Sequence, residues 1–244
     1  MPLSERLKAV SQLITPGLTV ADVGCDHGYL AIYLIRNGIS PHAIAMDVGE
    51  GPLSRAKEHV RESGLTEDIE LRLSDGLCEL KPGEADCVVM AGMGGMLMTD
   101  IMKRGREVLD GVKEIILQPQ SDIGYVRRFL EDNGYMIISE DIVHEDGKFY
   151  PVMKAVHGEM DLKSDAFYKF GSILLREQHP VLRMFLMQEM DRLNRVKVSL
   201  LSAPETDSVR EGLKTVSNDL NDVMEALEYC EGNDPIAVRE LYRR

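Results

Sequence analysis

The chain has 244 residues, a formal net charge of −13 and a hydrophobic content of 44%. This length accommodates one α/β domain of about 150 residues and a smaller second domain. No apolar run approaches the ~20 residues that cross a bilayer, and the N-terminus lacks the apolar core of a signal peptide, so we expect a cytoplasmic protein. The acidic charge would ordinarily count against a nucleic-acid partner. The four scattered cysteines include no Cys-x-x-Cys pair and favour reduced, packed thiols over a metal cluster or a disulfide framework.

Strand and helix patterns alternate through the first part of the chain. In chain order, the periodicity predicts helix 2–14, strand 18–23, helix 28–37, strand 42–48, helix 52–63, strands 69–73 and 85–91, a helix from the turn at 92–95 to about 109, strand 113–117, helix 123–133, and strands 135–142 and 149–156. The last two strands form a hairpin at the sheet edge. The pattern therefore predicts an α/β fold with a seven-stranded doubly wound sheet.

A second, helical domain is predicted after Gly158, which divides the chain into residues 1–158 and 159–244. Its last long helix alternates apolar steps of four and three, and the preceding helix repeats leucine every seven residues at Leu186, Leu193 and Leu200. The short link at 202–206 favours an antiparallel coiled-coil hairpin. A short terminal helix is expected to begin at Pro235.

The most informative segment is the turn from Asp22 to Gly28, which follows the first strand. Its glycines, Gly24 and Gly28, are typical of a nucleotide-binding turn, but the carboxylate of Asp26 between them would repel a pyrophosphate. S-adenosylmethionine has no phosphate and carries an ammonium and a sulfonium. The turn therefore favours that cofactor, with a structural turn capped by acids as the alternative.

Further cofactor contacts are expected where the next strands end. Asp47 lies about 20 residues on, where doubly wound folds place an acid on the ribose hydroxyls. The turn at 74–76 is positioned to bind the adenine edge, although it could also be an ordinary turn. Small residues at 91–95 would let a substrate base approach the methyl group. The predicted cofactor-binding residues are Asp22, Gly24, Cys25, Asp26, Gly28, Asp47, Val48, Ser74, Asp75, Gly76, Ala91, Gly92 and Met93.

These motifs carry a resemblance to a known family. The segments 21–30 (ADVGCDHGYL), 91–95 (AGMGG) and 117–120 (LQPQ) look like those of the bacterial tRNA adenine-22 N1-methyltransferases. The similarity covers most of the chain, including the opening Leu-Ser-Glu-Arg-Leu and the helical tail. It implies a class I Rossmann-like methyltransferase domain that transfers a methyl group from S-adenosylmethionine to N1 of an adenine in tRNA.

The predicted chemistry requires little beyond positioning. The chain lacks the Asn/Asp-Pro-Pro-Tyr/Phe turn with which many enzymes hold an exocyclic amine, and adenine N1 already presents a lone pair. We therefore expect no obligatory general base and no metal. Asp26, His27 and Tyr29 are the candidates for contact with the reacting centre, although His27 and Tyr29 could equally be polar or packing residues at a helix start. A paired adenine would have to be extruded.

The expected substrate contacts include Gly94, Gln118 and Gln120 near the strand ends, with loop stabilisation as the alternative for the two glutamines. The basic first helix of the hairpin favours phosphate contact through Arg183, Arg192, Arg195 and Lys197. A packing or dimerising coiled coil is the alternative, so monomer and dimer stay open. The groups Lys103-Arg104 and Arg127-Arg128 are more typical of solvated helix faces. Two other functions also stay open, a small-molecule or protein methyltransferase of this fold and a catalytically silent adaptor.

Overall fold

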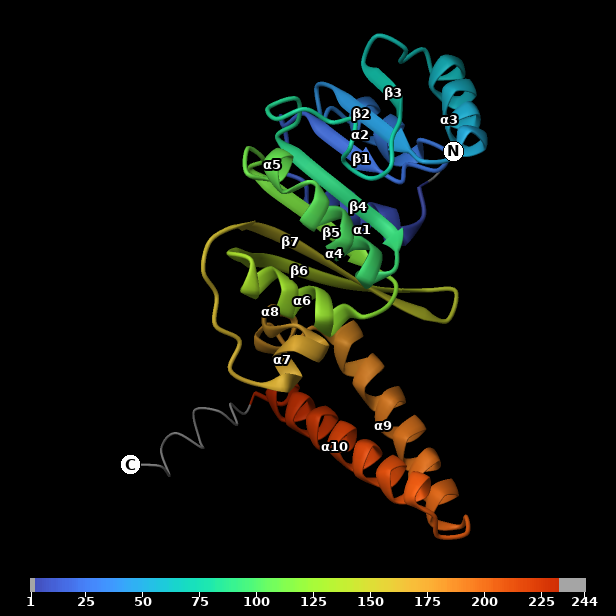
Figure 1. Ribbon diagram of the computed structural model, residues 1–244, viewed down its shortest axis with the longest axis vertical. Helices are drawn as coiled ribbons and strands as arrows, with labels where there is room; N and C mark the ends of the chain where they lie inside the picture. The colour runs from blue at the N-terminus through green and yellow to red at the C-terminus, as the bar shows by residue number, and fades with distance from the viewer. Residues whose placement is uncertain (1–2, 233–244) are drawn as a thin grey trace. The chain divides into compact units, whose positions relative to one another are not determined.

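The computed structural model describes residues 3–232 and divides the chain into two compact units that meet in sequence between Met160 and Asp161 (Figure 1). The junction lies two residues beyond the position expected from the pattern change. The helix expected from Pro235 lies outside the described residues. Among residues 3–232, every helix is too short or too polar to cross a membrane.

A single seven-stranded sheet forms the first unit, in the order β3-β2-β1-β4-β5-β7-β6. Its strands are β1 (Val20–Val23), β2 (Ala43–Asp47), β3 (Ile69–Leu73), β4 (Cys87–Met93), β5 (Glu114–Pro119), β6 (Tyr135–Glu145) and β7 (Lys148–His157). The first five strands are parallel, and β7 runs antiparallel to both β5 and β6. The predicted doubly wound sheet with an edge hairpin is confirmed.

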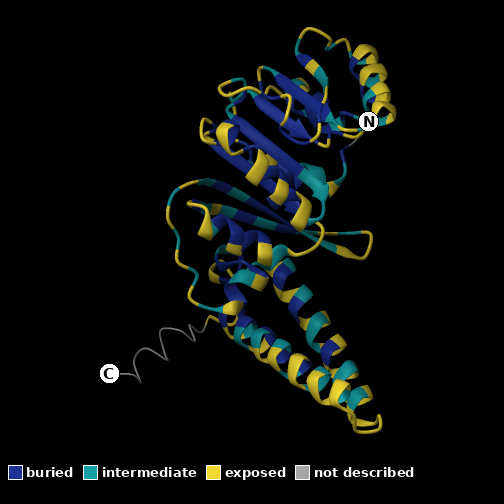
Figure 2. Ribbon diagram, in the orientation of Figure 1, coloured by how far each residue is buried: buried dark blue, intermediate teal, exposed yellow. Residues whose placement is uncertain are grey.

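Helices cover both faces of this sheet (Figure 1). One face packs against α1 (Glu5–Leu13), α2 (Tyr29–Arg36) and α3 (Glu50–Glu62), and the other against α4 (Gly95–Arg104), α5 (Arg106–Leu109) and α6 (Ile123–Asp132). Successive strand residues point to opposite faces, so Val20 packs towards α1 and α2 while Ala21 packs towards α4 to α6. Both faces are therefore apolar. The central strands β1 and β5 are buried throughout, whereas β4 becomes half-buried at its carboxyl end (Figure 2).

The strand order reverses between β1 and β4. Val23 of β1 pairs with Met46 of β2 on one side and with Met90 of β4 on the other. In open α/β sheets ligands bind at the carboxyl ends of the strands beside such a reversal. The fold therefore places the ends of β1, β2 and β4 around one potential binding site.

The helix predicted to run to about residue 109 is broken at Gly105 into α4 and α5. A Cβ atom added at Gly105 would lie 2.4 Å from Leu77 Cδ1, so the chain there packs directly against the segment that follows β3. The expectation of one continuous helix is therefore wrong. Apolar periodicity continues through the break, and only the long-range contact with Leu77 reveals it.

One predicted surface group is buried. The side chain of Arg127 on α6 is 1% exposed, and its Nη2 lies 2.8 Å from Glu140 Oε1 on β6. Removing one partner of such a pair leaves a buried charge and typically costs about 3–5 kcal/mol. The expectation of a solvated helix face is wrong at Arg127, which joins α6 to the sheet.

The second unit contains α7 (Asp165–Phe170), α8 (Ser172–Arg176), α9 (Pro180–Leu201) and α10 (Asp207–Cys230). The two long helices pack against each other, and their buried apolar residues include Leu186 and Leu193 on α9 and Leu220 and Val223 on α10. The ammonium of Lys169 on α7 pairs with two carboxylates of α10, Asp219 and Asp222, each at 2.6 Å. The apolar seam is thus engaged within one chain.

Candidate active site

A cleft of about 1140 Å³ opens at the carboxyl ends of β1, β2 and β4. Its lining combines the turn after β1 with the end of β2, the end of β4 and one side of α1. Predicted cofactor and catalytic residues that line it are Asp22, Gly24, Cys25, Asp26, His27, Tyr29, Asp47, Ala91 and Gly92, together with the predicted substrate residue Gln120. The topology thus brings together segments that are far apart in the sequence.

The turn after β1 is held in shape by its glycines and by a carboxylate from β2. Gly24 and Gly28 have φ values of 76° and 72°, and Asp26 adopts φ 49°, a left-handed conformation that favours glycine and, among other residues, aspartate and asparagine. The Asp26 N–H donates to Asp47 Oδ2 at 3.1 Å, and the Gly49 N–H donates to Asp47 Oδ1 at 2.8 Å. Asp47 therefore fixes the turn, and it also lines the cleft.

Asp22 is the most perturbed carboxyl group of the cleft. It is 4% exposed, and its Oδ2 atom has no hydrogen-bond partner among residues 3–232. Burial, followed by the negative charge of Asp47, raises the pKa of Asp22 to about 7. A buried carboxyl oxygen without a donor is costly, so a cationic donor that reaches Asp22 from the cleft would be bound favourably.

Close packing surrounds the turn. A Cβ atom at Gly24 would lie 3.0 Å from Met93 Cε, and one at Gly28 would lie 3.3 Å from Ala56 Cβ. Neither Gly28 nor Met93 lines the cleft, so their contribution is to shape its floor. The thiol of Cys25 is buried, and this burial together with the charges of Asp22 and Asp47 raises its pKa well above its usual range. Cys25 therefore contributes bulk rather than a reactive thiolate.

Residues predicted for the adenine end lie beyond the cleft lining. Val48 is 71% exposed although it is apolar, and it directly follows Asp47. The Ser74 N–H donates to the Asp47 carbonyl at 2.9 Å, and the Ser74 hydroxyl donates to the Gly76 carbonyl at 2.9 Å. Asp75 pairs with Arg104, with Nη1 and Oδ2 2.8 Å apart, and this hydrogen bond lowers the pKa of Asp75. An exposed apolar face beside a polar turn suits a flat heterocycle.

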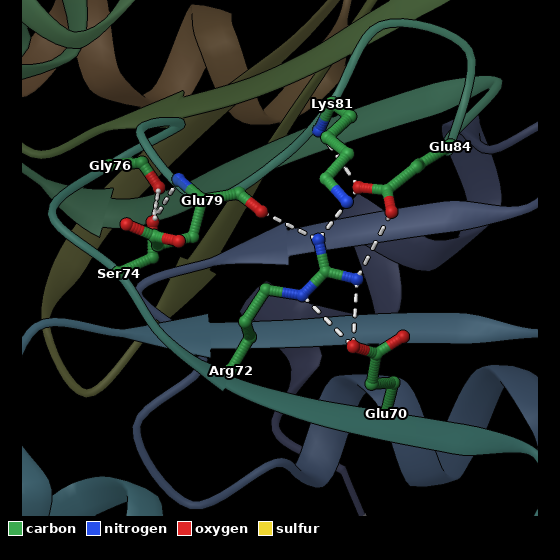
Figure 3. A network of polar contacts seen from close by, with 7 residues as sticks. All are labelled: Glu70, Arg72, Ser74, Gly76, Glu79, Lys81 and Glu84. Atoms are coloured by element: carbon green, nitrogen blue, oxygen red, sulfur yellow. Dashed lines mark hydrogen bonds and ion pairs between the residues drawn. The ribbon is translucent and has the colours of Figure 1, made fainter.

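A polar network fixes the connection between β3 and β4 (Figure 3). From β3, Arg72 Nη1 donates to the Glu79 carbonyl at 2.6 Å and to Glu84 Oε2 at 2.7 Å. The Ser74 hydroxyl accepts the Glu79 N–H at 3.2 Å. The turn that contains Ser74 is therefore held from both sides.

Three rings stack at the wall of the cleft. The centroids of Tyr29 and His59 are 4.9 Å apart and those of His27 and Tyr29 are 5.4 Å apart. His59 Nδ1 lies 3.0 Å from the His27 carbonyl, which can only accept, so that nitrogen carries the proton. His27 Nδ1 is buried, and no described residue forms a hydrogen bond with it. His59 was not among the predicted site residues; its sequence signal is its place on the same face of α3 as the buried Ala56.

The predicted substrate residues near β4 and β5 differ in exposure. Gln120 is exposed at the cleft, whereas Gln118 is 0% exposed and its Oε1 accepts a hydrogen bond from Arg6 Nη1 at 3.0 Å. A Cβ atom at Gly94 would meet Ser121 Oγ at 3.1 Å, so Gly94 allows the neighbouring loop to approach closely. Arg6 itself lines the cleft and was absent from the predicted site.

Basic residues predicted to contact tRNA lie on α9. Arg192 pairs with Glu189, with Nη2 and Oε1 2.6 Å apart, and Arg183 Nη1 contacts the Met187 sulfur at 3.6 Å. Within residues 3–232, Arg195 and Lys197 lie at ion-pair distance from no carboxylate. Three of these four cations are therefore available to an external anion.

Several known proteins resemble this chain in sequence and fold. A family model described as tRNA (adenine(22)-N(1))-methyltransferase matches residues 20–225. The Bacillus subtilis protein of that name is 34% identical over 234 residues, which covers 94% of this chain and 98% of that relative. A Streptococcus pneumoniae protein solved in complex with S-adenosyl-L-methionine has a TM-score of 0.83 at 32% identity, covering 93% of this chain and 100% of that chain. A Mycoplasma capricolum relative solved with S-adenosyl-homocysteine has a TM-score of 0.81 at 25% identity, covering 93% and 99%.

Proposed function

The chain belongs to the tRNA (adenine(22)-N(1))-methyltransferase family, and we propose that its cleft binds S-adenosylmethionine and presents the methyl group to N1 of adenine 22 in tRNA. The family assignment fixes the reaction, and the buried carboxyl of Asp22 is the observation that carries the assignment of the cleft. Of the other functions left open by the sequence, neither a small-molecule or protein methyltransferase nor an adaptor accounts for a family match from residue 20 to residue 225.

The residues present fit the cofactor. Asp22 would accept the ammonium, because its buried Oδ2 atom has no partner and a charge-assisted hydrogen bond there would offset its desolvation. Asp47 would accept the ribose hydroxyls with the lone pairs that Asp26 and Gly49 leave free. Val48 would cover one face of the adenine. When bound, the cofactor supplies a sulfonium-activated methyl group.

The protein's own contribution to the reaction is mainly positioning. The target nitrogen presents its lone pair before the reaction, so no side chain needs to remove a proton first. Methylation leaves a positive charge on the adenine, and the carboxylates of Asp22 and Asp26 lie on the cleft wall, where negative charge favours that product. We therefore assign Asp26 an electrostatic role, and no residue a role as general base.

The ring stack provides the surface for an extruded base. Tyr29 lines the cleft between His27 and His59, and aromatic side chains commonly stack on bases that enzymes draw out of a helix. Gln120 lies exposed at the same cleft, within reach of a base edge. The proposal assigns adenine 22 to this wall.

The helical unit is proposed to hold the body of the tRNA. Arg183, Arg195 and Lys197 on α9 have no carboxylate partner within the described residues, which suits them to phosphates. Arg192 would have to leave Glu189 to take part. We place the reaction in the cytoplasm, where the tRNA substrate is found.

Labelled S-adenosylmethionine and an unmodified tRNA with adenine at position 22 provide the test, followed by nucleoside analysis. We expect N1-methyladenosine in this tRNA and no label in the same tRNA with guanine at position 22. Label in the tRNA with guanine at position 22, or a methylated nucleoside other than N1-methyladenosine, would contradict the proposal. The Asp22→Asn variant should methylate at least about tenfold more slowly at subsaturating cofactor, since a hydrogen bond to a charged group is worth about 1.5–3 kcal/mol.

A further inference from the structure

We propose that Arg6 is a phosphate-binding residue of the cleft and that it holds a backbone phosphate flanking adenine 22, oriented by the buried amide of Gln118. The inference rests on the proposed function, since it assumes a tRNA nucleotide in the cleft. It assigns the substrate contact to a residue of α1 that the motifs of the strand ends do not include.

Neutral partners hold the guanidinium of Arg6 in place. Its Nη1 donates to Gln118 Oε1 at 3.0 Å, across 112 residues of sequence. Gln118 is fully buried, and its Nε2 donates to the Pro119 carbonyl at 3.5 Å, which leaves its Oε1 towards Arg6. The guanidinium carbon also lies 5.7 Å from the ring centroid of Tyr150, which is within cation–π distance. These contacts orient the planar fork without neutralising its charge.

The charge of Arg6 is also not cancelled by an acid. Within residues 3–232, no carboxylate lies at ion-pair distance from its guanidinium, although it lines a cleft that contains Asp22, Asp26 and Asp47. Arg72, Arg104 and Arg127 of the same unit each pair with a carboxylate. Arg36 also lines the cleft and has no ion pair within residues 3–232, but Arg6 is the one whose guanidinium lies beside Gly92 at the end of β4. A guanidinium has five N–H donors, and Gln118 accepts only one from Arg6. The others are available to a ligand.

Arg6 lies at the reacting end of the cleft. A Cβ atom at Gly92 would be 3.1 Å from Arg6 Nη1, so the absent side chain of Gly92 leaves the space that the guanidinium occupies. Gly92 has φ 82° and lies within a register shift between β4 and β5, which turns the end of β4. The small residues at the end of β4 were predicted to admit the base, and the structure shows that Gly92 also admits Arg6.

An anion is the ligand that this arrangement favours. Methylation at N1 produces a cationic adenine, and a bare guanidinium beside the ring would raise the energy of that product. A phosphodiester bound to the fork removes this cost, and the fork matches two phosphate oxygens. A protein of net charge −13 also needs local cations wherever it contacts RNA.

Attachment of α1 does not require the guanidinium. Val10 on α1 and Ile14, which directly follows α1, are both buried. Glu145 Oε1 accepts the Glu5 N–H at 2.8 Å. The Ser4 side chain caps the helix by accepting the Leu7 N–H at 3.3 Å. These contacts are independent of the Arg6 side chain, so its removal should leave the fold intact.

The test is a double-mutant cycle that combines the Arg6→Gln variant with a tRNA in which one phosphate is replaced by a neutral group. Two modified tRNAs are used, one with a methylphosphonate on the 5′ side of adenine 22 and one with it on the 3′ side. For each tRNA and for the unmodified one, kcat/KM is measured with the wild type, Arg6→Gln and Arg6→Lys. Lys8→Gln is the matched control. Lys8 also lies on α1, but it pairs with Glu5 and does not line the cleft. We expect one methylphosphonate to lower wild-type kcat/KM at least about tenfold and to have no further effect on Arg6→Gln. Arg6→Lys should recover part of the loss, and Lys8→Gln should match the wild type.

The proposal would be overturned if the methylphosphonates lowered kcat/KM equally in the wild type and in Arg6→Gln. It would also be overturned if neither methylphosphonate lowered kcat/KM of the wild type. Binding of S-adenosylmethionine should be unchanged in Arg6→Gln, and a matching loss of cofactor affinity would show a structural role instead. The slope of log affinity for tRNA against log salt should fall in Arg6→Gln by about 0.7–0.9, the value of one phosphate contact. A wild type that leaves adenine 22 unmethylated would refute the proposed function itself, which is a different result.

Discussion

The carboxylate of Asp47 at the end of β2 accepts the backbone N–H of Asp26 at 3.1 Å, so two acids that are 21 residues apart in sequence form one structural unit. Asp26 has φ 49°, and this hydrogen bond helps to hold it there. The acid expected to bind the ribose therefore also shapes the turn expected to bind the methionyl group. Loss of Asp47 should affect both parts of the cofactor.

Replacement of Asp47 should separate these two contributions. Asp47→Asn keeps one carbonyl oxygen for the turn and loses the charge, whereas Asp47→Ala loses both. We expect S-adenosylmethionine to bind about tenfold or more weakly to Asp47→Asn and still more weakly to Asp47→Ala, as measured by calorimetry. Glu50→Gln, at the exposed start of α3, is the matched control. Unchanged affinity in Asp47→Ala would place the ribose elsewhere.

Cofactor affinity should depend on pH through Asp22. The pKa of Asp22 in the cofactor-free protein is raised to about 7, so below that pH the carboxyl must lose a proton before it can pair with an ammonium. The affinity of the wild type should therefore rise up to about tenfold per pH unit towards pH 7 and then level off. Asp22→Asn should bind weakly and show only the cofactor's own titration. A wild-type profile parallel to that of Asp22→Asn would contradict the assignment of the ammonium.

The same group should affect folding stability. Folding raises the pKa of Asp22 from its usual 3.8 to about 7, so the folded state binds more protons than the unfolded state between these values. The contribution of Asp22 to the free energy of unfolding therefore falls as pH rises from about 4 to 7, by up to about 4 kcal/mol. Urea denaturation at pH 5 and pH 8 measures this, with Asp22→Asn as reference. The variant should gain stability relative to the wild type at pH 8, and a pH-independent difference would disprove the prediction.

The helical unit should contribute to tRNA affinity. Arg195 and Lys197 have no carboxylate partner within the described residues, so the double variant Arg195→Gln, Lys197→Gln should raise KM for tRNA and lower the salt slope by about 1.4–1.8. Cofactor affinity should stay the same. Lys214→Gln on the acidic α10 serves as the control. A double variant with wild-type KM and slope would make this face of α9 structural.

Most of the sheet could be predicted from local patterns. Asp22 lies near the end of β1, Asp47 lies at the end of β2, and a buried run around Val88 marks β4. Because these strands are parallel, their carboxyl ends meet at one edge of the sheet. The substrate that accepts the methyl group could not be derived in this way. The charge of the chain argued against RNA, and only the resemblance of the motifs indicated tRNA.

Contacts between distant segments were beyond sequence reasoning. Arg6 meets Gln118 across 112 residues, and nothing near Arg6 in the sequence signals that a buried amide orients it. His59 joins the rings of His27 and Tyr29 only because α2 and α3 lie on the same face of the sheet. Apolar periodicity predicts a helix through Gly105, and the break there could not be predicted because Leu77, which packs against it, belongs to another segment. In each case the missing information is tertiary.

The carboxylates at the ends of β1 and β2 are proposed to bind the cationic cofactor. A crystal structure of this protein with S-adenosylmethionine would show whether they do. We predict the ammonium within about 3 Å of Asp22 Oδ2, the ribose hydroxyls on Asp47, and Asp26 beside the methionyl group. A cofactor that lies in this cleft without contacting Asp22 or Asp47, or that binds elsewhere on the sheet, would contradict the account.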